Sequence, residues 1–169
     1  MIELRLRDHG LVRSKEVFSP FWIDWVRFDV LGQVEDVNEI LEELVTHVQY
    51  GFSYLGPREV HDSFEDAHGP YVLSAMSTRL FEPVAPATAK MDLSEWLIER
   101  SEPHWSFRSL GLSLIADLPD RGSAFRLPDL EGSIPVTELG WIVGSQGFDE
   151  WIFIDETRET LTLVVATDD

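Results

Sequence analysis

Residues 141–166 read WIVGSQGFDEWIFIDETRETLTLVVA, and this stretch decides the fold. It contains three runs rich in aliphatic, β-branched and aromatic residues, at 141–143, 150–155 and 160–166. Such runs favour β-strands, and the polar segments GSQG and ETRE between them are typical of turns. Consecutive strands joined by short turns pair antiparallel. We therefore predict a three-stranded antiparallel meander in this last part of the chain.

The preceding part of the chain supplies further strands and helices. Residues 2–7 alternate apolar and charged side chains, as a strand with one buried face does, and residues 21–30 are apolar on both sides, which indicates a more central strand. Apolar residues recur every three or four positions across 34–48, the spacing of an amphipathic helix, and a shorter helix is predicted at 93–100. These patterns predict the α+β class: a mostly antiparallel sheet with two or three helices packed on one face, ending in the three-stranded meander.

Length and composition indicate a single folded domain, residues 1–169. A chain of 169 residues in which 44% are hydrophobic can bury one sizeable core. It contains no cysteine, which excludes disulfides, thiolate nucleophiles and thiolate zinc sites. No apolar run is long enough to cross a membrane, and the N-terminus lacks the apolar core of a signal peptide. We expect a cytoplasmic protein that does not associate with membranes.

Charge is the most unusual property of the sequence. Thirty-one Asp and Glu residues oppose thirteen Lys and Arg residues, so the net charge is −18. Fifteen of these eighteen negative charges fall in two segments, 28–57 and 129–169. A surface this acidic repels the phosphate backbone of nucleic acids and anionic membranes, and it attracts basic proteins or cations. The charge therefore argues against direct nucleic-acid binding and favours a basic protein partner.

The acidic residues of the helix at 34–48 are the main candidates for contact with such a partner, because no Lys or Arg lies among them. An ordinary solvated helix face explains the same residues, and both interpretations stay open. Trp105 is the tryptophan most expected to be exposed, and an exposed aromatic residue suits the anchor of an interface. Acidic residues in the turn 147–150 complete the set. The predicted partner-binding residues are Glu35, Asp36, Glu39, Glu42, Glu43, Trp105, Asp149 and Glu150.

Motifs for catalysis or cofactor binding are missing from the sequence. It contains no Gly-x-Ser-x-Gly nucleophile motif, no Walker A loop and no Gly-x-Gly-x-x-Gly loop. Residues 61–68, HDSFEDAH, place two histidines and three carboxylates close together, but their spacing matches no metal-binding pattern. We expect a solvated loop there, with no metal or cofactor and no enzymatic activity.

Residues 139–165 resemble the C-terminal signature of the SUKH superfamily. In that signature a Gly-containing turn, here 144–147, leads into an acidic residue and an apolar strand that ends in Asp, and a last strand follows after another turn. Residues 107–112, FRSLGL, are similar to a segment further upstream in the family, whereas Glu159 stands where the family often has Gly. Many SUKH members look like immunity proteins that bind and neutralise bacterial toxin domains, often nucleases. The resemblance implies the same role for this chain.

Three hypotheses about function follow. The first is a non-enzymatic acidic protein that neutralises a basic protein partner, as an immunity protein does with a bacterial toxin or nuclease domain. Charge and resemblance support it independently, since a nuclease must present a basic groove to its substrate. The second is a phage or plasmid protein that mimics nucleic acid and inhibits a defence nuclease. The third is a small-molecule enzyme or sensor that uses the loop His61–His68. The sequence leaves the oligomeric state open.

Overall fold

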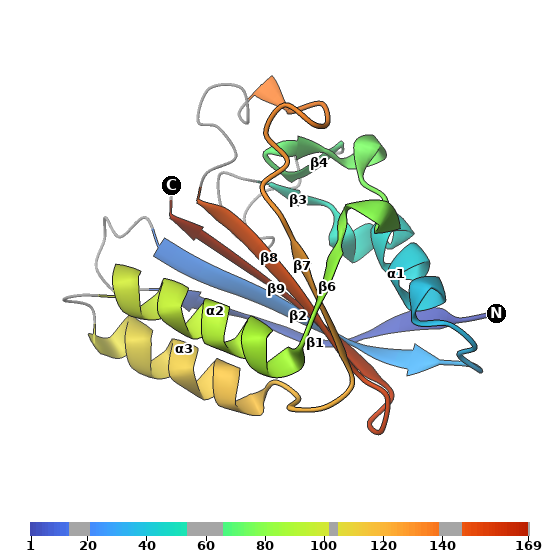
Figure 1. The fold of residues 1–169 in the computed structure, drawn as a ribbon, viewed down its shortest axis with the longest axis horizontal. Coiled ribbons are helices and arrows are strands. Elements are labelled where there is room, and N and C mark those ends of the chain that lie inside the picture. Colours follow the sequence, from blue (N-terminus) through green and yellow to red (C-terminus); the bar gives the residue numbers. More distant parts are fainter. Residues whose placement is uncertain (14–20, 54–65, 102–104, 139–146, 169) are drawn as a thin grey trace.

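A six-stranded antiparallel sheet forms the centre of the protein (Figure 1). The computed structural model describes residues 1–13, 21–53, 66–101, 105–138 and 147–168. In spatial order the strands are β1 (Glu3–Arg13), β2 (Phe21–Leu31), β9 (Thr160–Asp168), β8 (Phe148–Asp155), β7 (Ser123–Leu127) and β6 (Glu82–Val84).

The last strands form the predicted meander. β7, β8 and β9 follow one another both along the chain and across the sheet. β8 and β9 pair from Phe148 opposite Thr167 to Asp155 opposite Thr160. The predicted α+β class and the mostly antiparallel sheet are confirmed as well. The run 141–143, predicted as one strand of the meander, lies outside the described residues.

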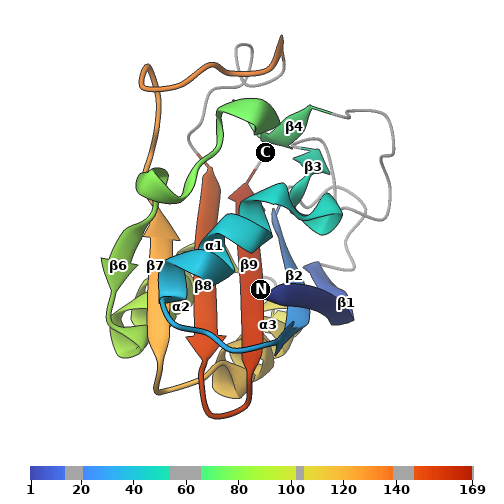
Figure 2. The ribbon, with the colours of Figure 1, turned by 90° about the vertical axis from the view of Figure 1, so that its right-hand side faces the viewer.

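Helices cover both faces of the sheet (Figure 2). α1 (Val37–Thr46) packs on one face, where Leu41 belongs to the first core cluster. α2 (Pro86–Arg100) and α3 (Trp105–Asp117) pack on the opposite face, where Leu97 belongs to the second core cluster. The prediction that the helices pack on one face was therefore wrong. β2, β8 and β9 contribute buried apolar side chains to both clusters, so each face of the sheet has to be covered.

A small second sheet extends the layer that contains α1. Tyr50 and Tyr71 come from this region and belong to the same core cluster as the buried residues of α1. The region therefore covers part of the same face of the large sheet. Its elements are the 3-10 helices η1 (Val48–Tyr50), η2 (Leu73–Ala75) and η3 (Thr78–Leu80), with the strands β3 (Phe52–Ser53), β4 (Ala67–Gly69) and β5 (Tyr71–Val72).

The helix boundaries differ from the predicted ones. α1 begins at Val37 because Asp36 caps it, which leaves residues 34–36 outside the helix. α2 begins at Pro86, seven residues before the predicted start, because proline suits the first turn of a helix. α3 was not predicted. Among the described residues, no helix combines the length and the apolar character that a membrane span needs.

Candidate partner-binding site

α1 is held in place by its cap and by its apolar side. The carboxylate of Asp36 accepts hydrogen bonds from the backbone N–H of Asn38 (3.0 Å) and from the side-chain amide of the same residue (3.0 Å). These bonds, the backbone one above all, lower the pKa of Asp36 below its ordinary value. Ile40, Leu41 and Leu44 are buried, so one side of the helix is fixed against the sheet.

The acidic side of α1 therefore faces solvent. Glu35, Asp36, Glu39 and Glu42 are exposed, and Glu43 is half-buried. These five predicted residues all have surface that a partner could contact. Their exposure agrees equally with a solvated helix face, so a second feature is needed to distinguish the two interpretations.

That feature is a groove of about 530 Å³ between the start of α1 and the turn that joins β8 to β9. Glu35 borders it on the helix side, and Asp155, Glu156 and Glu159 border it on the turn side. We call this site the acidic groove. The rest of its lining is largely apolar and consists of Val30, Gly32, Gln33, Val34, Val37, Ile40 and Ile154.

The acidic groove joins the two segments that carry most of the negative charge, 28–57 and 129–169. No Lys or Arg is found among its described lining residues. Asp155 is paired with Arg158 of the same turn (Nε to Oδ2, 3.4 Å), so Glu35, Glu156 and Glu159 supply most of the negative potential of this concave place. The sequence placed these charges in two separate segments, and the fold brings them together.

Hydrogen bonds fix the turn side of the acidic groove. Oδ1 of Asp155 accepts from the backbone N–H groups of Thr157 (3.0 Å) and Arg158 (3.1 Å). The carbonyl of Glu159 accepts from the backbone N–H of Val30 (2.8 Å), which ties the turn to β2. Glu159 has φ 51°, in the left-handed region that favours glycine. The backbone of the turn and the side chain of Asp155 are therefore held in place.

Glu150 lies in the core, and its prediction as a partner-binding residue was wrong. Its side chain is fully buried on the face of β8 that α1 covers. One carboxylate oxygen contacts Nε2 of His68, which is also fully buried, and the other accepts a hydrogen bond from the hydroxyl of Tyr50 (3.3 Å). Nδ1 of His68 lies 2.6 Å from the backbone carbonyl of Tyr50. Glu150 thus belongs to an internal polar network.

The alternation of β8 could have identified this burial. Successive side chains of a strand point to opposite faces, so Glu150 shares its face with Ile152 and Ile154 and not with Asp149. The segment 147–150 was interpreted as a turn, which hid that pattern. β8 begins at Phe148, so Asp149 and Glu150 are strand residues on opposite faces and cannot both face one partner.

Asp149 is half-buried on the face that α2 and α3 cover. Burial raises the pKa of its carboxyl above the ordinary value, and the positive charges of Arg100 and Arg126 partly offset that effect. Arg100 also binds Asp168 on β9 through Nε (2.7 Å). Asp149 therefore belongs to a charged cluster beside α2, on the far side of the sheet from the acidic groove.

Trp105 is exposed as predicted, but it lies far from α1 in the fold. Its side chain is 70% exposed at the start of α3, on the opposite face of the sheet. The guanidinium of Arg108 lies 5.4 Å from its ring centroid. In the described part of the chain, other large apolar side chains are also exposed on α2 and α3, namely Met91, Ile98, Leu110 and Leu112. Trp105 thus belongs to a second surface, separate from the acidic groove.

The histidine-rich loop 61–68 falls only partly within the described chain. Residues 61–65 lie outside the described part of the chain, and His68 is the buried partner of Glu150. No group of three or more potential metal ligands is found among the described residues. Comparisons of the chain with protein-family models, curated proteins and solved structures find no match.

Proposed function

We propose that the protein is a non-enzymatic acidic binding protein that neutralises a basic protein partner in the cytoplasm. The proposed partner is a bacterial toxin domain, so the protein acts as an immunity protein. The observation that carries this proposal is the acidic groove, in which carboxylates from two distant segments surround an apolar floor. A helix face that is merely solvated does not require a second acidic segment opposite it.

The acidic groove fits the side chain of an Arg or a Lys from the partner. The methylene stem of either residue packs on apolar surface while its charged end stays near polar groups. Here the stem would contact Val34, which is 41% exposed, and Val37. The charged end would meet Glu35 and Glu156, and such charge-assisted hydrogen bonds are among the strongest in proteins.

A nuclease is the kind of toxin that this charge suits best, because it must present a basic surface to a polyanionic substrate. An acidic protein bound there blocks the substrate site sterically. Electrostatic attraction would raise the association rate by roughly 10- to 1000-fold at low salt. The resemblance of residues 139–165 to the SUKH signature supports the same role.

The geometry gives less support to a nucleic-acid mimic. α1 has ten residues. At ~1.5 Å per residue it is about 15 Å long, less than half of one duplex turn of about 34 Å. The remaining carboxylates of the acidic groove face α1 across a concavity and do not lengthen a ridge. A pocket for single side chains describes this arrangement better than a copy of a phosphate backbone.

The test begins with the partner. The wild-type protein is immobilised and used to capture proteins from toxin-producing bacteria. Each captured toxin domain is then assayed for nuclease activity and for growth arrest, with and without the acidic protein. We expect neutralisation at a stoichiometric ratio. A triple variant, Glu35→Lys, Glu156→Lys and Glu159→Lys, should lose neutralisation.

The matched control changes the same charge elsewhere. Glu82→Lys, Glu95→Lys and Glu99→Lys alter three exposed residues of β6 and α2, away from the acidic groove. This variant should still neutralise the toxin. Equal loss of neutralisation in both variants would mean that the effect depends only on the net charge of the protein. Unchanged neutralisation by the groove variant would show that the acidic groove is not part of the interface.

A further inference from the structure

A second cavity lies on the other face of the sheet, beyond the end of α3. Its volume is about 660 Å³, which is within the usual range of about 300 to 1,000 Å³ for small-molecule sites. Although the chain is strongly acidic, four of its thirteen Lys and Arg residues line this cavity. We call it the arginine pocket. Its four arginines are Arg7 on β1, Arg27 on β2, Arg121 after α3 and Arg158 in the β8–β9 turn.

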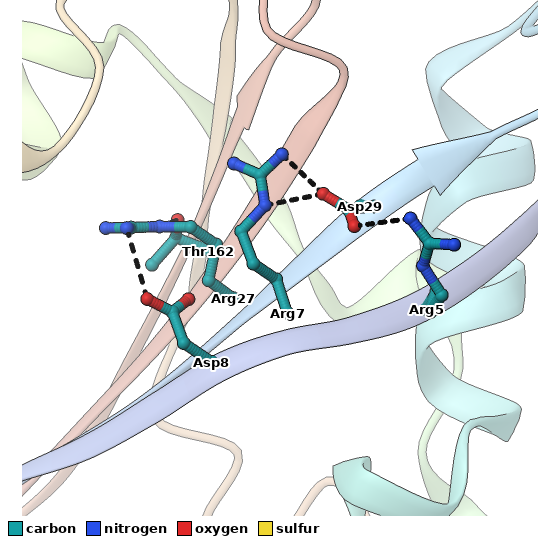
Figure 3. Close-up of polar contacts among 6 residues, drawn as sticks. All are labelled: Arg5, Arg7, Asp8, Arg27, Asp29 and Thr162. Atoms are coloured by element: carbon teal, nitrogen blue, oxygen red, sulfur yellow. Dashed lines mark hydrogen bonds and ion pairs between the residues drawn. The ribbon is translucent and has the colours of Figure 1, made fainter.

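A β-bulge in β1 lies at Arg7, which lines the arginine pocket, and Figure 3 shows the contacts of Arg7 with Asp29. The pairing of β1 with β2 shifts between Leu6 and Asp8, so Arg7 is the extra residue. Bulges re-aim side chains and are common beside functional sites. Here Arg5 and Arg7 both bind the carboxylate of Asp29, and Nη2 of Arg5 lies 3.0 Å from Oδ2. One aspartate is thus shared by two arginines.

Arg27 reaches the same pocket from the neighbouring strand. Its Nε donates to the hydroxyl of Thr162 (3.4 Å), and its Nη1 lies 3.7 Å from a carboxylate oxygen of Asp8. Its guanidinium also lies 5.3 Å from the ring centroid of Trp25, which helps to orient it. A guanidinium carries five N–H donors, and these contacts occupy only some of them. The side chain of Arg27 is 24% exposed, so a ligand can reach it.

The local charge balance differs from that of the whole protein. Six cations lie in or next to the pocket: the four arginines, Arg5 on Asp29 and Lys90 on Asp120 (2.7 Å). Five aspartates oppose them, which leaves one net positive charge in a chain of net charge −18. The five are Asp8, Asp29, Asp117, Asp120 and Asp155.

Hydroxyl groups add neutral donors to the arginine pocket. Thr157, Thr160 and Thr162 line it, and the last two are buried at 7% and 3% exposure. Hydroxyls and guanidinium groups from four separate parts of the chain therefore surround one space. A tetrahedral phosphate, with several acceptor oxygens pointing in different directions, suits such a set better than a planar carboxylate does.

We propose that the arginine pocket binds the phosphate group of a small molecule. The net charge of the protein selects against long polyanions, because a nucleic acid would also have to cross the surrounding acidic surface. A single phosphate or phosphate monoester is small enough to meet only the local arginines. This site shares Asp155 with the acidic groove but opens on the other face of the sheet, and its ligand does not depend on the proposed toxin partner.

The test uses the intact protein with inorganic phosphate, glycerol 3-phosphate and acetate as probes. Backbone amide shifts are followed by NMR at constant ionic strength. We expect saturable shifts at Thr160, Thr162 and Arg121 with both phosphate probes, and weaker binding of acetate. Arg121→Glu, a change on an exposed loop, should weaken phosphate binding by about tenfold. Arg79→Glu, an exposed control far from the pocket, should change it less than about twofold.

The outcomes separate the sources of the phosphate. Tighter binding of glycerol 3-phosphate than of inorganic phosphate supports the site and assigns it to a phosphate monoester, whereas equal affinities support a site for the free ion. Absence of saturable shifts with both probes overturns the proposal. So do acetate binding at equal affinity and equal weakening by Arg121→Glu and Arg79→Glu. Arg27→Gln is a second variant. Its phosphate binding is measured only if its amide spectrum shows the native fold.

Discussion

His68 and Glu150, 82 residues apart in the chain, form one hydrogen-bonded pair in the core, with both side chains fully buried. The carbonyl of Tyr50 can only accept, so Nδ1 of His68 must carry a proton. A second proton lies between Nε2 and the carboxylate. The pair is neutral overall whether that proton resides on Nε2 or on the carboxylate. The ring of Tyr50 stacks on the imidazole, with centroids 3.8 Å apart, and fixes its orientation.

Removal of one partner of this pair should be strongly destabilising. Glu150→Ala leaves the imidazole without its carboxylate in a buried place and should lower the free energy of unfolding by about 3–5 kcal/mol. Glu150→Gln should cost about 1–2 kcal/mol, because the amide N–H can donate to a neutral imidazole while the amide oxygen accepts from Tyr50. Urea denaturation measures both. Equal losses for the two variants would contradict this description of the hydrogen bonds.

Asp149 lies on the opposite face of the same strand. Its contribution to the stability of the protein should fall as the pH rises, whereas that of a typical ion-paired carboxylate increases. Burial raises its pKa in the folded state, so the folded protein binds this proton more readily than the unfolded chain does. The contribution of Asp149 to stability therefore falls as pH rises from about 3.8 through its raised native pKa. Asp149→Asn should be more stable than the wild type at pH 7, and the difference should vanish as the pH approaches 4. Denaturation curves across that range measure it, and a constant difference would refute the assignment.

The conformation of Glu159 predicts a stabilising substitution. A left-handed φ of 51° is unfavourable for a residue with a Cβ. Glu159→Gly removes that cost and should raise the free energy of unfolding by up to about 1 kcal/mol after the entropy of the unfolded glycine is counted. Glu156→Gly is the matched control, because it removes the same charge from the same turn at a residue without positive φ. It should lower stability, and an equal gain in both variants would point to charge relief instead of backbone strain.

The sequence predicted the β-strands better than it predicted what covers them. Alternation and β-propensity located β1, β2, β8 and β9, because these long strands carry strong local patterns. Residues 21–30 are apolar on both sides, and this pattern implies that both faces of the sheet are covered. The prediction places the helices on one face, whereas α1 covers one face and α2 and α3 cover the other.

The sequence did not predict α3, and the packing of α3 against α2 explains why it is nevertheless a helix. Its sequence, WSFRSLGLSLIAD, contains Gly111 and three serines, which disfavour a helix locally. In the fold, a Cβ at Gly111 would lie 2.6 Å from a methyl group of Leu97. The glycine therefore allows α2 and α3 to approach closely, and this tertiary contact outweighs its low propensity.

The candidate site was predictable in part. The acidic residues of α1 followed from helical spacing and were placed at the surface correctly. The second half of the acidic groove, Asp155, Glu156 and Glu159, was visible only as excess charge in the C-terminal segment, because no local pattern tells which helix a turn will face. The arginine pocket depends on a β-bulge and on four distant segments, so no local pattern in the sequence indicates it.

Charge reversal on α1 and at Glu35 just before it should slow association with the captured partner. Glu35→Lys, Glu39→Lys and Glu42→Lys together should reduce the association rate by about tenfold or more at low salt, and the difference should shrink at physiological ionic strength as charges are screened. The triple variant at Glu82, Glu95 and Glu99 should show a smaller reduction. Stopped-flow kinetics at several salt concentrations measure both. Unchanged rates for the α1 variant would remove this helix from the interface.

Trp105 distinguishes the two surfaces of the protein. It lies on the opposite face of the sheet from α1, so one compact partner domain in the acidic groove should leave it uncovered. Acrylamide, which is neutral and therefore insensitive to the charge of the protein, should quench Trp105 strongly because its side chain is 70% exposed, whereas Trp25 is half-buried and Trp22, Trp96 and Trp151 are at most 8% exposed. Trp105→Phe should remove much of the quenchable emission without loss of stability. If quenching of Trp105 persists when the partner binds, the partner does not cover the start of α3, as the acidic-groove proposal requires. If binding protects Trp105 and Trp105→Ala weakens affinity, the partner docks on α3, and the sequence-based choice of Trp105 was right where the choice of α1 was wrong.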